Sequence, residues 1–205
     1  PTIKGSVKIE ILKDGIVVST QETPNTLVLE APKIMLGNLL PPMLSGNNTV
    51  SFPNTTGQVR PTISAGGMDG PSARLAVTYL SLGYITGDVN PPSVVVDPTD
   101  MLPLASNNYV TKLLTDVSLG EYSVEFICSF AVDDATADRK YFEAALLCPA
   151  ESDFLSGPPV DPEDNFFEAG DQVMFAHQVH NVIQASSGST IRYTWTITMQ
   201  DPSNT

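Results

Sequence analysis

Few side chains in this sequence could do chemistry, and the two histidines come first. His177 and His180 form a His-x-x-His spacing, which suits a metal ion when both side chains share one face of a helix. The residues around them, 173–179, instead read as a strand, in which successive side chains point to opposite faces. His177 would then share a face with three apolar residues, Val173, Phe175 and Val179. We therefore expect a structural role for His177 rather than metal binding or acid–base chemistry.

Carboxylates gather in two segments and could hold Ca²⁺, which prefers oxygen ligands. One group is Asp133, Asp134 and Asp138, and the other is Asp161, Glu163, Asp164, Glu168 and Asp171. Neither group has the Asp-x-Asp-x-Asp-Gly spacing, with a closing Glu, that marks an EF-hand loop. We expect solvated acidic loops and assign no metal ligands.

Motifs for a nucleophile or a bound phosphate are missing. The sequence holds no Gly-x-Ser-x-Gly, no phosphate-binding loop and no Cys–His motif. Trp195 with Tyr193 could suggest a carbohydrate platform, but both fall on the apolar face of the last strand, which favours burial in the core. We expect no catalytic residues, no cofactor and no enzymatic activity.

The two cysteines, Cys128 and Cys148, are expected to be reduced and buried. If residues 133–140 close a hairpin, Cys128 pairs near Ala144 while Cys148 lies near Val124. Four strand positions then separate the thiols by roughly 13 Å, beyond the limit of about 7 Å between Cα atoms for a disulfide.

Strand-type alternation defines the elements that would position these residues. Every second residue is apolar from 122 to 132, and residues 190–199 repeat the rule. A hairpin with its turn at Lys13-Asp14-Gly15 begins the chain. Helical spacing of apolar residues predicts one helix at 27–40, which Pro41-Pro42 ends. The other expected strands are 75–84, 109–114, 140–148, 173–183 and 190–200.

These elements predict a mainly β protein: an antiparallel, jelly-roll-like β-sandwich with one short α-helix and long loops. We expect a single β domain over 1–205, with a hairpin and short helix at 1–42, an extended loop or arm at 43–73 and the sandwich core at 74–205. Segment 43–73 is either an arm lying along a neighbouring subunit or a variable surface excursion. A second excursion, rich in Pro and acidic residues, covers 149–171.

Charge and hydropathy exclude several classes of partner. The formal net charge is −13; residues 1–87 hold six basic and five acidic groups, whereas 88–205 hold four basic and eighteen acidic groups. Phosphate backbones bind basic surfaces, so nucleic acid is not an expected partner. No run of 18 apolar residues is present, so no membrane partner is expected. The sequence shows no secretory signal, and its start at Pro1 is the one expected after removal of an initiator Met in a bacterial cytosol.

Several short motifs together carry a family resemblance. They are an Asn-Thr-Leu-Val entry into the apolar helix at 25–40, Leu-Ser-Leu-Gly at 80–83, a Pro/Asp stretch at 91–102, Glu-Ala-Ala-Leu at 143–146, Met-Phe-Ala at 174–176 and Trp-Thr-Ile at 195–197. In this order they resemble a loosely related group of tailed-bacteriophage virion proteins. The chain departs from that pattern in its longer excursions, 43–73 and 149–171, and in Gln184, which replaces a Lys often seen there.

The resemblance implies a non-enzymatic virion protein. The first expectation is a capsid decoration (cement) protein: a homotrimer on the outer capsid surface, made in the cytoplasm of the host bacterium, that clamps neighbouring major capsid proteins and stabilises the head. Segment 43–73, with residues 1–4, would lie over the capsid proteins. The alternatives are a tail, baseplate or fibre-attachment protein and, from another class, a glycan-binding β-sandwich module.

Overall fold

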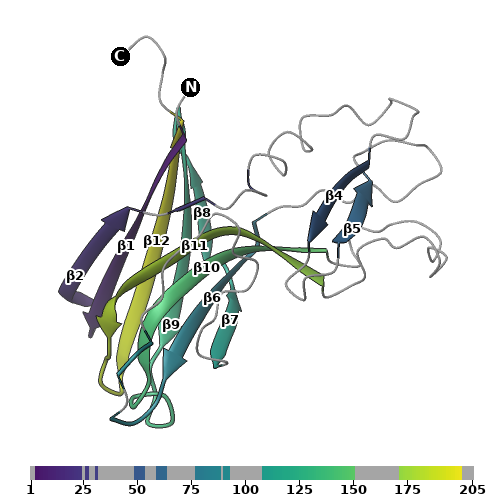
Figure 1. Cartoon of the computed structure of the whole chain (residues 1–205). Helices are drawn as coiled ribbons and strands as arrows, with labels where there is room; N and C mark the ends of the chain where they lie inside the picture. The colour runs from purple at the N-terminus through teal and green to yellow at the C-terminus, as the bar shows by residue number, and fades with distance from the viewer. Residues whose placement is uncertain are drawn as a thin grey trace.

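The computed structural model describes residues 3–24, 26–27, 31, 49–53, 59–63, 77–88, 90–92, 108–150 and 171–199. Two five-stranded antiparallel sheets make up most of this part of the chain, and a two-stranded sheet lies to one side of them (Figure 1). The expectation of a mainly β, sandwich-like protein is confirmed.

Sheet A joins the two ends of the described chain. Its strand order is β2-β1-β12-β9-β8, with β1 at Ile3–Lys13, β2 at Ile16–Pro24, β8 at Asp116–Leu119, β9 at Ser123–Ala131 and β12 at Ser189–Met199. β1 pairs with β12 along its whole length, from Ile3 opposite Met199 to Lys13 opposite Ser189. The N-terminal hairpin, which we had placed outside the sandwich core, thus supplies two of the five strands.

The β1–β2 turn explains how this hairpin closes. Asp14 and Gly15 have φ angles of 52° and 78°. Positive φ at both central residues is the signature of a type I′ turn, whose twist matches that of the strands it joins, and Asp-Gly is a favoured pair there. The predicted turn is confirmed.

Sheet B has the order β3-β11-β10-β6-β7. Its strands are β3 (Thr26–Leu27), β6 (Tyr79–Ile85), β7 (Tyr109–Leu113), β10 (Lys140–Ala150) and β11 (Asp171–Ile183). The strands expected at 109–114, 140–148 and 173–183 are all present, and the strand expected at 75–84 begins a few residues later, at Tyr79.

The inner faces of the two sheets form one hydrophobic core. β12 alternates buried and partly buried residues, as its sequence predicted, and places Trp195 and Tyr193, both fully buried, against sheet B. From sheet B, Leu80, Leu82 and Leu146 are equally buried. Burial of such side chains away from water supplies most of the stability of a sandwich of this kind.

The outer face of sheet B is buried as well. Ala145, Leu147 and Met174 form a second, smaller cluster there. A bulge in β11 leaves Phe175 without a partner on β10, because Leu146 pairs with Ala176 and Leu147 with Met174. Phe175 therefore joins the main core, and the next residues of β11 change faces relative to the simple alternation.

One predicted pairing is wrong. Residues 133–140 do not close a hairpin, because β9 belongs to sheet A and β10 to sheet B, so this connection crosses from one sheet to the other. Cys128 consequently does not pair near Ala144. The expected state of the thiols is nevertheless confirmed, since Cys128 and Cys148 are free and buried.

Several expectations fall largely outside the described residues. Of the helix expected at 27–40, only Leu27, which ends β3, and Ala31, which is helical and buried, are described. Segment 43–73 contains a hairpin of β4 (Thr49–Pro53) and β5 (Val59–Ile63), and the rest of it is not described. Segment 149–171 is described only at its two ends. No helix within the described ranges is long and apolar enough to cross a membrane.

Candidate functional site

A carboxylate–imidazole pair lies on the outer face of sheet B. Glu143 of β10 and His177 of β11 are 0% and 1% exposed, and His177 Nε2 lies 2.7 Å from Glu143 Oε1. Glu143 Oε2 is buried and has no hydrogen-bond partner among the described residues. Since both side chains are closed off from solvent, a substrate could reach neither group in this structure. The geometry therefore fits a contact that holds β10 and β11 in register.

The prediction that His177 shares a face with Phe175 is wrong. His177 pairs with Ala145 of β10, on the outer face, whereas Phe175 lies in the inner core. The bulge at Phe175 separates two residues that strict alternation places together. The expectation that His177 and His180 point to opposite faces is confirmed, because His180 contacts Tyr193 in the core.

His180 is held as a neutral imidazole. Its Nδ1 lies 2.8 Å from the carbonyl oxygen of Asn181, and its Nε2 lies 3.0 Å from the hydroxyl of Tyr193. A carbonyl oxygen only accepts, so Nδ1 carries the proton and Nε2 accepts from the Tyr193 hydroxyl. Burial lowers the pKa of His180 to about 4 and raises the pKa of Tyr193 well above its usual value.

A polar hollow of about 610 Å³ lies on the outer face of sheet A. Its floor carries an ion-pair network in which Glu10 accepts from Arg192 Nε at 2.9 Å and lies 2.7 Å from Lys8 Nζ. The hydrogen bond from Lys8 contributes most to keeping the pKa of Glu10 below its usual value, and the hydrogen bonds from Arg192 contribute next. The rest is lined by hydroxyl side chains such as Ser6 and Thr194, by the carboxylates of Glu22, Asp116 and Glu125, and by Ile127. None of the described residues that line this hollow is aromatic, so they offer no platform on which a sugar ring would stack.

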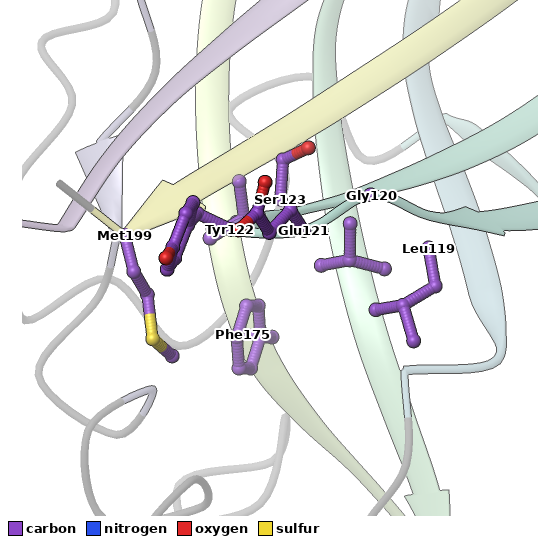
Figure 2. Close-up of a pocket in the computed structure, with 9 residues that line it drawn as sticks. Leu119, Gly120, Glu121, Tyr122, Ser123, Phe175 and Met199 are labelled. Carbon is purple, nitrogen blue, oxygen red and sulfur yellow. The ribbon is translucent and has the colours of Figure 1, made fainter. Parts of the chain in front are cut away.

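An apolar pocket of about 230 Å³ opens at one end of the sandwich. Figure 2 shows Leu119 and Met199 on either side of Phe175, with Tyr122 and Ser123 above it. The described residues that line it are Leu119, Gly120, Glu121, Tyr122, Ser123, Val124, Phe175, Ile197 and Met199. Phe175 comes from sheet B and the others from sheet A or the β8–β9 turn. The pocket is thus the place where the two sheets leave the core open.

The turn that borders this pocket is tight. The Gly120 N–H donates to the Ser123 carbonyl oxygen at 2.8 Å. A Cβ added at Gly120 would lie 2.6 Å from Ser123 Oγ, closer than real Cβ atoms come to other atoms. A side chain at position 120 would therefore require the Ser123 hydroxyl to rotate away. The backbone bond between Gly120 and Ser123 returns the chain towards β9 and leaves Leu119 at the rim.

Three of the predicted acidic residues are described in full, and they form no metal site. Asp133 stabilises its own turn: its Oδ1 accepts from the Thr136 hydroxyl at 2.7 Å, a bond that lowers the pKa of Asp133. Among the residues that the structure describes, no three His, Cys, Asp or Glu side chains converge as metal ligands would. Asp161, Glu163, Asp164 and Glu168 lie outside the described residues, and of Asp171 only the backbone is described.

The sequence interpretation missed the partnership of Glu143 with His177. The signal available was the position of Glu143 within the otherwise apolar run Tyr-Phe-Glu-Ala-Ala-Leu-Leu at 141–147. A carboxylate inside a buried strand needs a partner, and a histidine is one of the few that could serve in this sequence. Their separation of 34 residues hid the pair. The pocket was missed because its lining comes from four strands and a turn.

Compared with protein-family models, with curated proteins and with solved structures, the chain matches none.

Proposed function

We propose that this chain is a non-enzymatic structural protein of a tailed-phage virion, and that it serves as a capsid decoration protein clamping neighbouring major capsid proteins on the outer surface of the head. The resemblance of its motif order to such proteins supports the proposal. The geometry agrees with it, because the histidines, the thiols and the aromatic side chains of the last strand are committed to internal contacts.

The observation that carries the proposal is the position of the exposed apolar side chains. Single exposed apolar residues are common on any surface, but here they gather on the outermost strands of the two sheets. Seven exposed large apolar residues lie on such strands: Ile16, Val17 and Val18 on β2, Tyr109 and Leu113 on β7, and Val117 and Leu119 on β8. Exposed apolar edge strands favour pairing with another chain. These edges suit a protein that works by being packed against others.

Apolar contact at these edges would supply the clamp. Burial contributes about 25 cal/mol per Å², so roughly 800 Å² of apolar contact corresponds to about 20 kcal/mol before the costs of association are subtracted. Most of that gain is offset by lost rigid-body freedom and by the ordering of side chains. A modest net affinity is sufficient when many copies act on one shell.

The test is addition of the purified protein to preformed, undecorated capsids. We expect a trimer by light scattering, saturable binding to the capsids and release of packaged DNA at a higher temperature than from bare particles. Equal release temperatures with and without bound protein would refute a cement function. Binding to isolated tails and not to heads would instead place the protein at the tail, baseplate or fibre attachment.

A further inference from the structure

Strand β8 has a neighbour on only one side among the residues that the structure describes. It is the last strand of sheet A, and all four of its residues are exposed. Gly120 bonds to Ser123, and Leu119 and Val117 lie opposite Val124 and Phe126 of β9. Because antiparallel residues alternate between bonded and non-bonded positions, the N–H and C=O groups of Leu119 and Val117 point away from β9. Within the described part of the chain, the Val117 N–H donates to the carboxylate of its neighbour, Asp116 Oδ1, at 2.8 Å.

The apolar pocket lies directly beside this open edge. Leu119 belongs to both, since it ends β8 and forms one wall of the pocket while remaining 85% exposed. Engineered cavities of about 150 Å³ bind benzene, so a pocket of about 230 Å³ can hold one large aliphatic or aromatic side chain. An extended segment paired with β8 would carry such a side chain on the face that looks into the pocket.

Acidic side chains predominate around this edge. Lys8 and Arg192, which line the polar hollow together with Asp116 and Glu125, are already paired with Glu10. Residues 116–125 contain Asp116, Glu121 and Glu125 and no Lys or Arg. Among the described residues, no cation lies within ion-pair distance of these three carboxylates. A segment that docks here therefore gains from Lys or Arg beside its apolar residue.

We propose that β8 and this pocket form the docking site for an extended, basic segment of a partner protein. The segment adds a sixth strand to sheet A through the open groups of Val117 and Leu119, and it inserts one large apolar side chain among Leu119, Phe175 and Ile197. In doing so its backbone carbonyl replaces the carboxylate of Asp116 at the Val117 N–H. The inference rests on the proposed function for the identity of the partner, which would be a virion protein.

A second copy of this chain is the less favourable occupant. Antiparallel pairing of β8 with its own copy through Val117 and Leu119 around a twofold axis would set Asp116 of each copy opposite Gly120 of the other, beside its Glu121. Four carboxylates would then gather at one short edge, where like charges repel. A basic segment from a different chain meets no such repulsion.

Two fluorescent peptides test the site on the full chain. The first is acetyl-Lys-Thr-Phe-Thr-Val-Lys-amide, and the second replaces both Lys by Glu. We expect the Lys peptide to bind at least about tenfold more tightly than the Glu peptide at low salt. Leu119→Lys should weaken its binding by about tenfold or more, because it removes an apolar wall and adds a like charge. Val182→Lys is the matched control, since Val182 is also exposed and lies near the far end of β11; it should change binding less than about twofold.

Failure of this inference differs from failure of the proposed function. Absence of peptide binding by the wild type, or equal binding by Leu119→Lys and Val182→Lys, would overturn the docking site. A change in the oligomeric mass of the chain caused by Leu119→Lys would also overturn it, because the edge would then hold a second copy. If the wild type and Leu119→Lys bind undecorated capsids equally well, the docking site is wrong. If the wild type binds the Lys peptide but not the capsids, only the decoration function is wrong. Retained Trp195 fluorescence shows that each variant is folded.

Discussion

The buried histidine His180 predicts a specific pH dependence of stability. Its pKa is about 4 in the folded chain, against an ordinary value of 6.5, because burial disfavours the charged imidazole. As the pH falls through this interval, the unfolded chain takes up a proton that the folded chain does not. Stability is therefore full above about pH 6.5 and is lost on acidification.

The size of the effect follows from the two pKa values. A difference of one unit corresponds to about 1.4 kcal/mol. The free energy of unfolding should fall by about 2 kcal/mol between pH 7 and pH 5, and by about 3 kcal/mol at pH 4. The carboxyls of Glu10 and Asp133 have lowered pKa values in the folded chain, so they add to the loss of stability as the pH approaches their ordinary pKa values of 4.5 and 3.8, at the acid end of this window.

Urea unfolding at 25 °C, repeated from pH 7.5 to pH 4.5, measures this loss. His180→Gln is the informative variant, because glutamine does not titrate and its Oε1 can still accept from the Tyr193 hydroxyl. The difference between the wild type and His180→Gln isolates His180 from every other titrating group. An identical pH dependence in the two proteins, or an NMR titration of His180 above pH 6 in the folded state, would refute the reasoning.

Three further outcomes are expected. Replacing His177 by Leu should lower the free energy of unfolding by about 3–5 kcal/mol, because Glu143 then stays buried without the hydrogen bond from His177. In a double-mutant cycle measured by urea unfolding, the double variant Glu143→Leu, His177→Leu should lose less stability than the two single variants together. Cys128 and Cys148 should resist a thiol reagent at pH 8 until denaturant is added, since burial raises the pKa of Cys128 to about 11 and that of Cys148 further; rapid labelling of the folded chain would contradict this. Trp195→Phe should cost less than Trp195→Ala, for which a loss of about 3–5 kcal/mol in unfolding free energy is expected, and equal losses would show that the core does not hold this ring tightly.

The strands that could be predicted are those that bury one face. β9 and β12 alternate so strictly that their inner residues could be predicted from the sequence alone. These residues are Phe126, Cys128 and Phe130 in β9 and Ile191, Tyr193, Trp195 and Ile197 in β12. β8 was not predicted, because all its residues are exposed and a strand without a buried face leaves no alternation to detect.

Strand pairing was harder to predict than strand position. The short connection 133–139 between two alternating segments favours a hairpin, yet the chain crosses between sheets there. Alternation shows which face of a strand is apolar. It does not show whether the next strand pairs in the same sheet as a hairpin or lies in the opposite sheet, because the apolar faces meet the core in both arrangements. The single extra residue in β11, Phe175, likewise leaves no mark in the sequence, although it decides the side on which His177 lies.

The pairing of β1 with β12 sets the order in which the molecule can fold. During synthesis, at about 5–20 residues per second, Ser189 follows its partner Lys13 by roughly 10–35 s. For that time the β1–β2 hairpin has no neighbour along β1, and the exposed apolar residues that begin β2, Ile16, Val17 and Val18, are free to meet other nascent chains. The central pairing of sheet A is also its most distant in sequence, a topology that slows folding. Joining β12 to β1 by a short linker, in a circular permutant, would turn this slowest contact into a local hairpin.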